Sequence, residues 1–547
     1  MTKRILGILL TLCLVLPTLA LAADNSNLNA PGTFPIAKEK ETFTVMVPQG
    51  GTYDVNDCFI NQDYEEKTNI HVDFITVPSD TWKEKVSVTI AGGDYPDVIA
   101  GMDTFNIVPT DEAMYAAQGV LFPLNDLIDE YMPNFKALMD ADPSIKKLIA
   151  QDDGNIYSLP LIAECFHCNY SQKMYINSQW LENLSLEIPT TLDEYYAVLK
   201  AFKEQDANGN GDPNDEIPLI TSKAGWHVAL DGFLMNAFTY CDADTYLAIE
   251  NGDLVYTATT EAYREGLRFL NKLYTEGLLS PESFTNDDQT NTKINVSGGD
   301  YTLFGSFPAA YQMYIGDTEL WRDYEIMAPF VREDGTASTP NYSLTRNVIR
   351  GNFAVTSSAK HPEMILQWLD YFYSEEGKMY RKGREGIEWE KPAEGETDFN
   401  GNPAKYKNLQ TPEDDPFYGN VDFSQNIPYL DSKEHRESAV IASTNFREDP
   451  TNWQEIQLFE ATKNYVKVAP SNIESLPNLT VSEDKTMDYS RIKTEIHDYQ
   501  QEALVQFITG AMSLDNDWDA YVRQLQAIGL DEYMALSNES YHTFLNR

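Results

Sequence analysis

The sequence predicts an α/β fold in which helices cover parallel strands and the chain divides into at least two lobes. Strand-like and helix-like segments alternate near the start of the chain, and the alternation continues through its later part. Removing a 22-residue leader from the 547 residues leaves 547 − 22, or about 525, which is more than one hydrophobic core ordinarily holds. We therefore expect two or more lobes.

The first elements define the sheet. Apolar residues alternate over 43–47 as in a strand, and a sharp turn follows at 48–51. The next segments are an amphipathic helix over 54–67, a strand over 70–77, a helix capped by Ser79 or Asp80 and ended by Gly92 and Gly93, and a short buried strand over 95–100. This β-α-β-α-β order favours a parallel sheet with helices on its faces.

The same alternation continues along the rest of the chain. Thr191 and Glu194 form the capping-box pattern at the start of a helix over 191–204. Other expected elements are a strand over 155–160, a helix over 260–276, a strand over 351–356, a helix opening at Pro362, a loop-rich stretch over 391–435 and a helical segment over 485–545.

The N-terminus predicts export. Lys3 and Arg4 precede an apolar run over 5–16, which Pro17 interrupts before the small residues at 20–22. This run is too short to cross a bilayer as a helix, so residues 1–22 are expected to be a cleaved signal peptide. No cysteine follows the expected cleavage site for lipid attachment, and the polar stretch over 23–40 predicts a flexible tether.

The charge of the chain excludes one class of partner. There are 85 acidic and 40 basic residues, a net charge of −45. A surface this negative repels phosphates, so we expect no nucleic-acid partner. We also expect a monomer.

The cysteines leave a metal or redox role open but do not favour it. After the leader, Cys58, Cys165, Cys168 and Cys241 remain, too few for a disulfide scaffold in a chain this long. Cys165 and Cys168 have the CxxC spacing, with His167 between them. A zinc site usually needs a second ligand pair, and none is evident in the sequence; no helix opens at the motif as in a thioredoxin. Buried or incidentally paired thiols are the favoured interpretation.

The strongest local pattern predicts a calcium site. Residues 206–216 read DANGNGDPNDE, so side-chain oxygens alternate along the first half of the loop, with Gly211 at the sixth position, where a calcium loop turns. Oxygen donors without nitrogen or sulfur select Ca²⁺. The alternative is a solvated acidic loop. The expected ligands of a structural Ca²⁺ are Asp206, Asn208, Asn210, Asp212, Asp215 and Glu216.

Several short motifs, in their order and spacing, resemble a known family. They are GGDYPDVI at 92–99, LFPLND at 121–126, GNIYSLP at 154–160, MYINSQWL at 174–181, IPTTLDE at 188–194, FITG at 507–510, WDAYV at 518–522 and GLDEY at 529–533. The chain is identified as a member of the bacterial extracellular solute-binding proteins, family 1. It is most similar to the large Gram-positive type and the alginate-oligosaccharide-binding proteins, and distantly similar to maltose-binding protein.

The resemblance implies a type II periplasmic-binding-protein-like fold, with two α/β lobes and a ligand cleft between them. The implied lobes are 41–160 plus 345–383 and 161–335 plus 386–547. The implied function is to bind an oligosaccharide in the cleft and deliver it to the permease subunits of an ABC importer. The calcium loop resembles that of the alginate-binding relatives, with one extra residue before its closing acids.

Cleft residues are expected at the carboxyl ends of the strands and at the crossings between lobes. Rings suit the apolar faces of sugars, and polar side chains suit their hydroxyls. By position in the family, the expected ligand-binding residues are Gln49, Tyr53, Asp103, Glu164, Trp226 and Trp389. For each tryptophan, core packing is the alternative.

Other functions stay open at this point. A peptide cargo, a surface adhesin or sensor, and a glycoside hydrolase are the alternatives. No GxSxG, HExxH or phosphate-loop motif occurs, and with 85 acids the proximity of any two carboxylates in sequence carries no information. We therefore expect a binding protein and not an enzyme.

Overall fold

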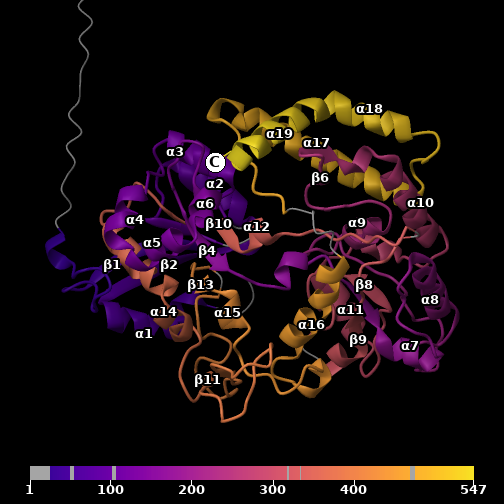
Figure 1. Ribbon diagram of the computed structural model, residues 1–547, viewed down its shortest axis with the longest axis horizontal. Helices are drawn as coiled ribbons and strands as arrows, with labels where there is room; N and C mark the ends of the chain where they lie inside the picture. The colour runs from indigo at the N-terminus through magenta and orange to yellow at the C-terminus, as the bar shows by residue number, and fades with distance from the viewer. Residues whose placement is uncertain are drawn as a thin grey trace, which may run out of the picture.

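Two lobes make up the computed structural model, which describes residues 25–49, 54–101, 106–316, 319–332, 334–424, 426–468 and 475–546. Figure 1 shows the first lobe, coloured mostly indigo and purple, on the left and the second lobe on the right. The first lobe holds a six-stranded sheet in the order β13-β4-β10-β3-β1-β2. These strands are β1 Glu41–Gln49, β2 Ile70–Pro78, β3 Val98–Ala100, β4 Leu159–Ala163, β10 Val348–Val355 and β13 Leu430–Asp431.

The strand directions bring functional loops to one edge of this sheet. β1 pairs in parallel with β2 and β3, and β13 pairs in parallel with β4. β10 is antiparallel to both β3 and β4, so β4 runs in the same direction as β3. The carboxyl ends of β1, β3, β4 and β13 therefore meet at one edge, from which β4 leads into the second lobe.

Apolar side chains on both faces hold the first lobe together. Val45 and Val98 on neighbouring strands are fully buried, and Trp368 from α13 packs edge-on against Phe43 of β1. The helices of this lobe are α1 Phe59–Thr68, α2 Trp82–Gly92, α3 Pro109–Ala117, α4 Asn125–Tyr131, α5 Pro133–Ala141, α6 Pro143–Ile149, α13 Pro362–Asp370 and α14 Glu375–Tyr380.

The second lobe contains a smaller, antiparallel sheet in the order β8-β5-β9, with its own core. Its strands are β5 Met174–Asn177, β8 Ser306–Pro308 and β9 Tyr324–Ile326, with a hairpin of β6 Leu247–Glu250 and β7 Asp253–Tyr256. Its helices are α7 Ser178–Leu184, α8 Leu192–Glu204, α9 Leu230–Leu234, α10 Glu261–Thr275, α11 Asp288–Val296, α16 Trp453–Val468, α17 Glu483–Thr509, α18 Trp518–Ile528 and α19 Leu530–Asn546.

Short elements connect the lobes and form an irregular subdomain. α12 Ser343–Arg346 precedes β10, and the pair β11 Trp389–Glu390 and β12 Lys407–Asn408 lies in the segment that ends at α15 Lys433–Arg436. At the C-terminus, α17 packs on α3 of the first lobe as well as on α10, so the helices coloured yellow in Figure 1 span both lobes.

The α/β prediction is confirmed, and its early strands are parallel as expected. The capping box of Thr191 and Glu194 is also present. The expected strand over 351–356 is found at β10, which runs antiparallel because it returns from the second lobe. The strand expected over 155–160 begins later, at Leu159, so β4 shares only its first two residues with the prediction. The expected signal peptide over 1–22 lies outside the described residues.

Two expected boundaries need correction. The segment over 23–40 was expected to be a tether, but Ile36 and Ala37 are buried, and Phe34 packs on Tyr371 of the first lobe. Apolar side chains scattered among polar ones anchor this segment. The range 386–547 was expected in the second lobe, but β13 joins the first-lobe sheet and brings Phe423 into that core.

Within the described residues, no helix is both long and apolar enough to cross a membrane.

Candidate functional site

The loop that follows α8 is tied together by its own side chains. Asn208 Oδ1 accepts from the Asn210 N–H at 2.9 Å, and Asn210 Oδ1 accepts from the Asp212 N–H at 2.8 Å. Asp206 Oδ2 accepts from the Gly211 N–H at 3.0 Å, and Glu216 Oε1 accepts from the Ala207 N–H at 2.8 Å. These bonds curl residues 206–216 so that Asp206 and Glu216 lie at its base.

Two carboxylate oxygens of this loop lack a hydrogen-bond donor although they are buried, Asp206 Oδ1 and Glu216 Oε2. Burial also raises the pKa of the Glu216 carboxyl. Leaving such oxygens unpaired costs free energy, and a bound cation would satisfy them. Six oxygen-bearing side chains at this spacing fit Ca²⁺.

The six predicted ligands are brought together, but not all of them are free to face an ion. Asp215 accepts the side-chain amides of Asn208 and Asn210, at 3.0 and 2.7 Å. Asp212 Oδ1 accepts the backbone and side-chain N–H groups of Asn214. Asp206 and Glu216 are therefore the residues whose contacts most directly fit a cation.

A second cluster lies where α12 leads back toward the first lobe. The Arg346 guanidinium is 5.1 Å from the centre of the Trp226 ring, and the Tyr311 ring is 6.3 Å from it. Trp226 is half-buried, and its Nε1 is buried without a hydrogen-bond acceptor. Tyr311 is 37% exposed. An accessible pair of rings beside an unpaired N–H donor is suited to a ligand with an apolar face and hydroxyl oxygens.

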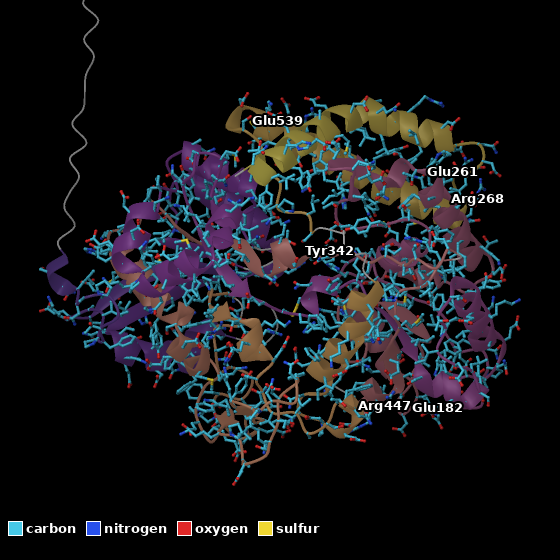
Figure 2. The ribbon with its side chains drawn as sticks, viewed as in Figure 1. Glu182, Glu261, Arg268, Tyr342, Arg447 and Glu539 are labelled. Carbon is cyan, nitrogen blue, oxygen red and sulfur yellow. A yellow bond between two sulfur atoms is a disulfide. The ribbon has the colours of Figure 1, made fainter. Side chains whose placement is uncertain are left out.

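Buried polar side chains pack beside this cluster. The His227 ring lies edge-on to Trp226, and the Tyr342 ring lies edge-on to His227. Tyr342 donates its hydroxyl to Asp242 Oδ1 at 2.9 Å and accepts from Gln172 Nε2 at 2.7 Å. Figure 2 shows Tyr342 near the middle of the molecule, between the two lobes. Burial, with a smaller effect from the Arg346 charge, lowers the pKa of His227 to about 3, so this imidazole is neutral at physiological pH.

Glu164 lies apart from Trp226, at the end of β4. Its Oε2 accepts from the Lys433 N–H at 2.8 Å, which ties the end of β4 to α15 after β13. It also lines an open hollow of about 610 Å³. The other lining residues are Asp398, Asn400, Asn402, Pro403, Lys405, Lys433, Glu434, Glu437 and Ser438.

Trp389 lies in β11, half-buried against the second-lobe cluster that includes Phe399 and Tyr406. Its Nε1 donates to the Gly383 carbonyl at 3.1 Å. Of the other predicted ligand residues, Gln49 ends β1 at the carboxyl edge of the sheet, whereas Tyr53 and Asp103 lie outside the described residues.

The structure therefore brings Tyr311 and Arg346 close to Trp226. The sequence did not single out Tyr311 or Arg346 as site residues. Tyr311 follows β8, and Arg346 ends α12, so no local pattern links them to position 226. A surplus of aromatic residues was the only available signal, and composition cannot assign a ring to a cleft.

Comparison with known proteins identifies the fold and its family. A family model described as "Bacterial extracellular solute-binding protein" matches residues 36–379, more than half of the chain. This protein belongs to that family. Two lobes, each with its own sheet and core, agree with this membership.

The solute-binding proteins similar to this chain include carbohydrate receptors. It is 28% identical over 522 residues to the "Fructooligosaccharide ABC transporter substrate-binding protein FusA" of Streptococcus pneumoniae, covering 94% of this chain and 92% of FusA. A structure of FusA with kestose has a TM-score of 0.76 at 26% identity and covers 92% of this chain and 99% of that chain.

A structure of the alginate-binding protein AlgQ2 without calcium ion has a TM-score of 0.67 at 20% identity, covering 92% of this chain and 99% of AlgQ2. At this identity the likeness shows the fold alone. It agrees with the type II arrangement of two lobes expected from the sequence, and these relatives are named as binding proteins.

Proposed function

We propose that this protein is the substrate-binding component of an ABC importer and that its cargo is an oligosaccharide held between the lobes. The observation that carries the proposal is the Trp226 cluster, a half-buried ring with an unpaired N–H beside the crossing at Arg346. Arg346 lies just before β10, at the carboxyl edge of β3 and β4, and ligands of open α/β folds bind at that edge. Membership of the solute-binding family and the likeness to FusA support it.

In this proposal Trp226 stacks on a sugar ring, and Arg346 and Asp244 bond hydroxyl groups. Asp244 Oδ2 lies 3.4 Å from His227 Nε2 and its side chain is 52% exposed, so it can face a ligand. Gln49, Tyr53 and Asp103 are proposed to contact the sugar from the first lobe. For Glu164 and Trp389, a ligand role is also proposed, although their contacts with Lys433 and Gly383 favour holding the fold.

The loop 206–216 is proposed to hold one Ca²⁺. Asp206 and Glu216 supply carboxylate oxygens, and Asn208, Asn210, Asp212 and Asp215 complete the oxygen shell or orient it. The ion would neutralise the acidic loop and fix the chain that leaves α8. A FusA structure described as an EF-hand mutant suggests a comparable loop in that relative.

Export as a monomer and docking on the permease subunits complete the proposal. The negative charge of the chain disfavours nucleic acid and anionic cargo alike.

The proposal is tested by screening the mature chain against neutral oligosaccharides, uronic oligosaccharides and peptides, with isothermal titration calorimetry and native mass spectrometry. We expect saturable binding of one oligosaccharide class, no binding of peptides and no cleavage products after long incubation. Binding of peptides alone, or release of shortened sugars, would contradict the proposal. Light scattering of the free protein tests whether it is a monomer.

A further inference from the structure

The turn that follows β4 carries sulfur and imidazole groups that the proposed function does not use. Cys165 and Cys168 form a disulfide. His167 lies between them, with its Nε2 3.4 Å from Cys165 Sγ and its Nδ1 3.8 Å from Cys168 Sγ. Three soft or borderline donor side chains thus share one tight turn just beyond the first crossing between the lobes.

A fourth donor arrives from a distant part of the chain. Glu455, in the first turn of α16, places its Oε2 3.2 Å from His167 Nε2. The same oxygen is 3.3 Å from Arg436 Nη2 in α15. His167 and Glu455 are 288 residues apart, so the local sequence around the CxxC motif could not supply the second ligand pair that a zinc site needs.

We propose that reduction of this disulfide creates a binding site for a zinc-class divalent ion, held by Cys165, Cys168, His167 and Glu455. Around tetrahedral zinc, with metal–ligand bonds of about 2.0–2.3 Å, neighbouring ligand atoms are roughly 3.3–3.8 Å apart. The separations between Cys165 Sγ and His167 Nε2 and between His167 Nε2 and Glu455 Oε2, 3.4 and 3.2 Å, are already close to this range. The two bonded sulfurs have to separate, and Cys168 Sγ, which lies 3.8 Å from His167 Nδ1, has to turn toward the Nε2 side of the ring.

The chemistry balances with a small dithiol as reductant. The dithiol gives two electrons and two protons to the Cys165–Cys168 bond and becomes a disulfide itself, leaving two thiols in the turn. Binding of the ion then releases both thiol protons to solvent, because the thiolate is the metal ligand. The oxidised form cannot offer these two ligands, so metal affinity depends on the redox state.

The site reaches solvent through Glu455, while Cys165 is buried, and it connects two parts of the molecule. Half of the Glu455 side chain is exposed, at 50%, and His167 and Glu455 line a small recess that shares Glu164 and Glu437 with the large hollow. Lys173, buried behind the turn, donates to the His167 and Tyr170 carbonyls and holds the backbone in place. A bound ion would tie the segment after β4 to α16 of the second lobe.

Co²⁺ titration of the mature protein tests this inference, with excess Ca²⁺ present to occupy the calcium loop. The protein is reduced by an immobilised phosphine that is removed under anaerobic conditions. We expect the reduced protein to bind one Co²⁺ with the ligand-field bands of a tetrahedral ion and a thiolate charge-transfer band, and Zn²⁺ to displace it. The untreated disulfide form should show neither band.

Variants decide whether these residues form the site. The double variant Cys165→Ser with Cys168→Ser should lose the charge-transfer band, and Glu455→Gln, which leaves both sulfurs in place, should weaken Co²⁺ binding by about tenfold or more. The matched control is Cys58→Ser with Cys241→Ser, which removes two buried cysteines outside the disulfide and should leave the titration unchanged. No tetrahedral spectrum in the reduced protein, or a thiolate band that survives replacement of both Cys165 and Cys168 by Ser, would overturn the inference.

Discussion

Arg350 Nη2 and Glu112 Oε2 form an ion pair of 2.5 Å inside the first lobe, with side-chain exposures of 2% and 0%. Gln151 and Ser158 also donate to the Glu112 carboxylate. The pair joins α3 to the crossing strand β10. Removing one charge leaves the other buried and unpaired, so Glu112→Gln should lower the free energy of unfolding by about 3–5 kcal/mol. Urea denaturation of the purified variant measures this loss.

Two further variants check that burial causes the effect. Glu261→Gln removes a partner of Arg264 whose side chain is 66% exposed, and this change should cost about 1 kcal/mol or less. Replacing both buried partners, by Glu112→Leu and Arg350→Met, should recover part of the loss, since no unpaired charge remains. Equal losses for Glu112→Gln and Glu261→Gln would contradict this explanation.

The calcium loop makes a second prediction. If Asp206 Oδ1 and Glu216 Oε2 face an ion, chelation by EGTA should lower the melting temperature, because an ion bound only to the folded state stabilises it by about 2.7 kcal/mol at a hundredfold excess over Kd. Asp206→Asn should make the melting temperature insensitive to Ca²⁺. Asp193→Asn, in the first turn of α8 and outside the loop, is the matched control. Elemental analysis without calcium and an unchanged melting curve would count against the site.

The sequence was sufficient for those parts of the fold that local periodicity determines. The strands near 43–47 and 70–77, the cap at Thr191 and the six oxygen-bearing residues of the loop are all local patterns, and each is found in the structure. The boundary of the second lobe, in contrast, could not be predicted from a local pattern. β13 pairs with β4 from a distance of about 270 residues, in a two-residue strand too short to show periodicity.

The candidate cleft shows the same limit. Trp226 could be proposed from its residue type, but Tyr311 and Arg346 reach it only through folding of the second lobe. Glu164 was expected to bind ligand because of its position after β4, yet its carboxylate also caps the segment after β13. Position along a family pattern placed Glu164 at the carboxyl edge of the sheet but could not reveal these competing contacts.

The two tryptophans are predicted to respond differently to truncation. Trp226→Ala should weaken oligosaccharide binding by about 2–4 kcal/mol with little change in melting temperature, because the ring is only half-buried and is the proposed stacking platform. Trp389→Ala should mainly lower the melting temperature, since its ring packs on the second-lobe cluster and its Nε1 is bonded. Calorimetry and thermal denaturation of both variants separate the roles. A loss of affinity in Trp389→Ala at unchanged stability would instead assign it to the sugar.

Asp370 predicts a pH dependence of stability. Its buried carboxylate accepts from the Asn134 and Phe135 N–H groups at the start of α5, but burial outweighs these bonds and raises its pKa to about 6. The folded state therefore binds this proton more tightly than the unfolded chain does. The resulting stabilisation is complete below pH 4 and is lost as the pH rises through 6. The free energy of unfolding should change by about 3 kcal/mol, because the pKa of Asp370 is about 6 and that of an unfolded Asp is about 3.9.

Asp370→Asn isolates this contribution because the amide does not titrate. The difference in unfolding free energy between the wild type and the variant should fall as the pH rises from 4 to 7, and urea denaturation at several pH values measures it. Asp126→Asn, on the neighbouring helix α4, serves as a background control. Parallel curves for the wild type and Asp370→Asn would show that Asp370 keeps an ordinary pKa.

Gly351 links stability to the candidate cleft. Its φ is +73°, in a region that favours glycine, and a Cβ there would lie 2.0 Å from the Ile107 carbonyl oxygen. Carbonyl oxygens of β10 also accept hydrogen bonds from Gly101, Asn106 and Ile107. These donors flank residues 102–105 in the sequence, and that segment includes the proposed sugar contact Asp103. Gly351→Ala must displace these anchors. We expect it to destabilise the first lobe by more than the roughly 1–2 kcal/mol of backbone strain alone, and to weaken sugar binding as well.

A matched glycine separates strain from displacement. Gly154 has a similar φ of +80°, but a Cβ there would meet no atom within 4 Å. Gly154→Ala should therefore show the backbone cost alone and keep full affinity for the oligosaccharide. Thermal denaturation and calorimetry of the two variants give both quantities side by side. If Gly351→Ala binds sugar as well as Gly154→Ala does, the contacts of β10 with Gly101, Asn106 and Ile107 do not affect the ligand, and this would contradict the proposed link between β10 and sugar binding.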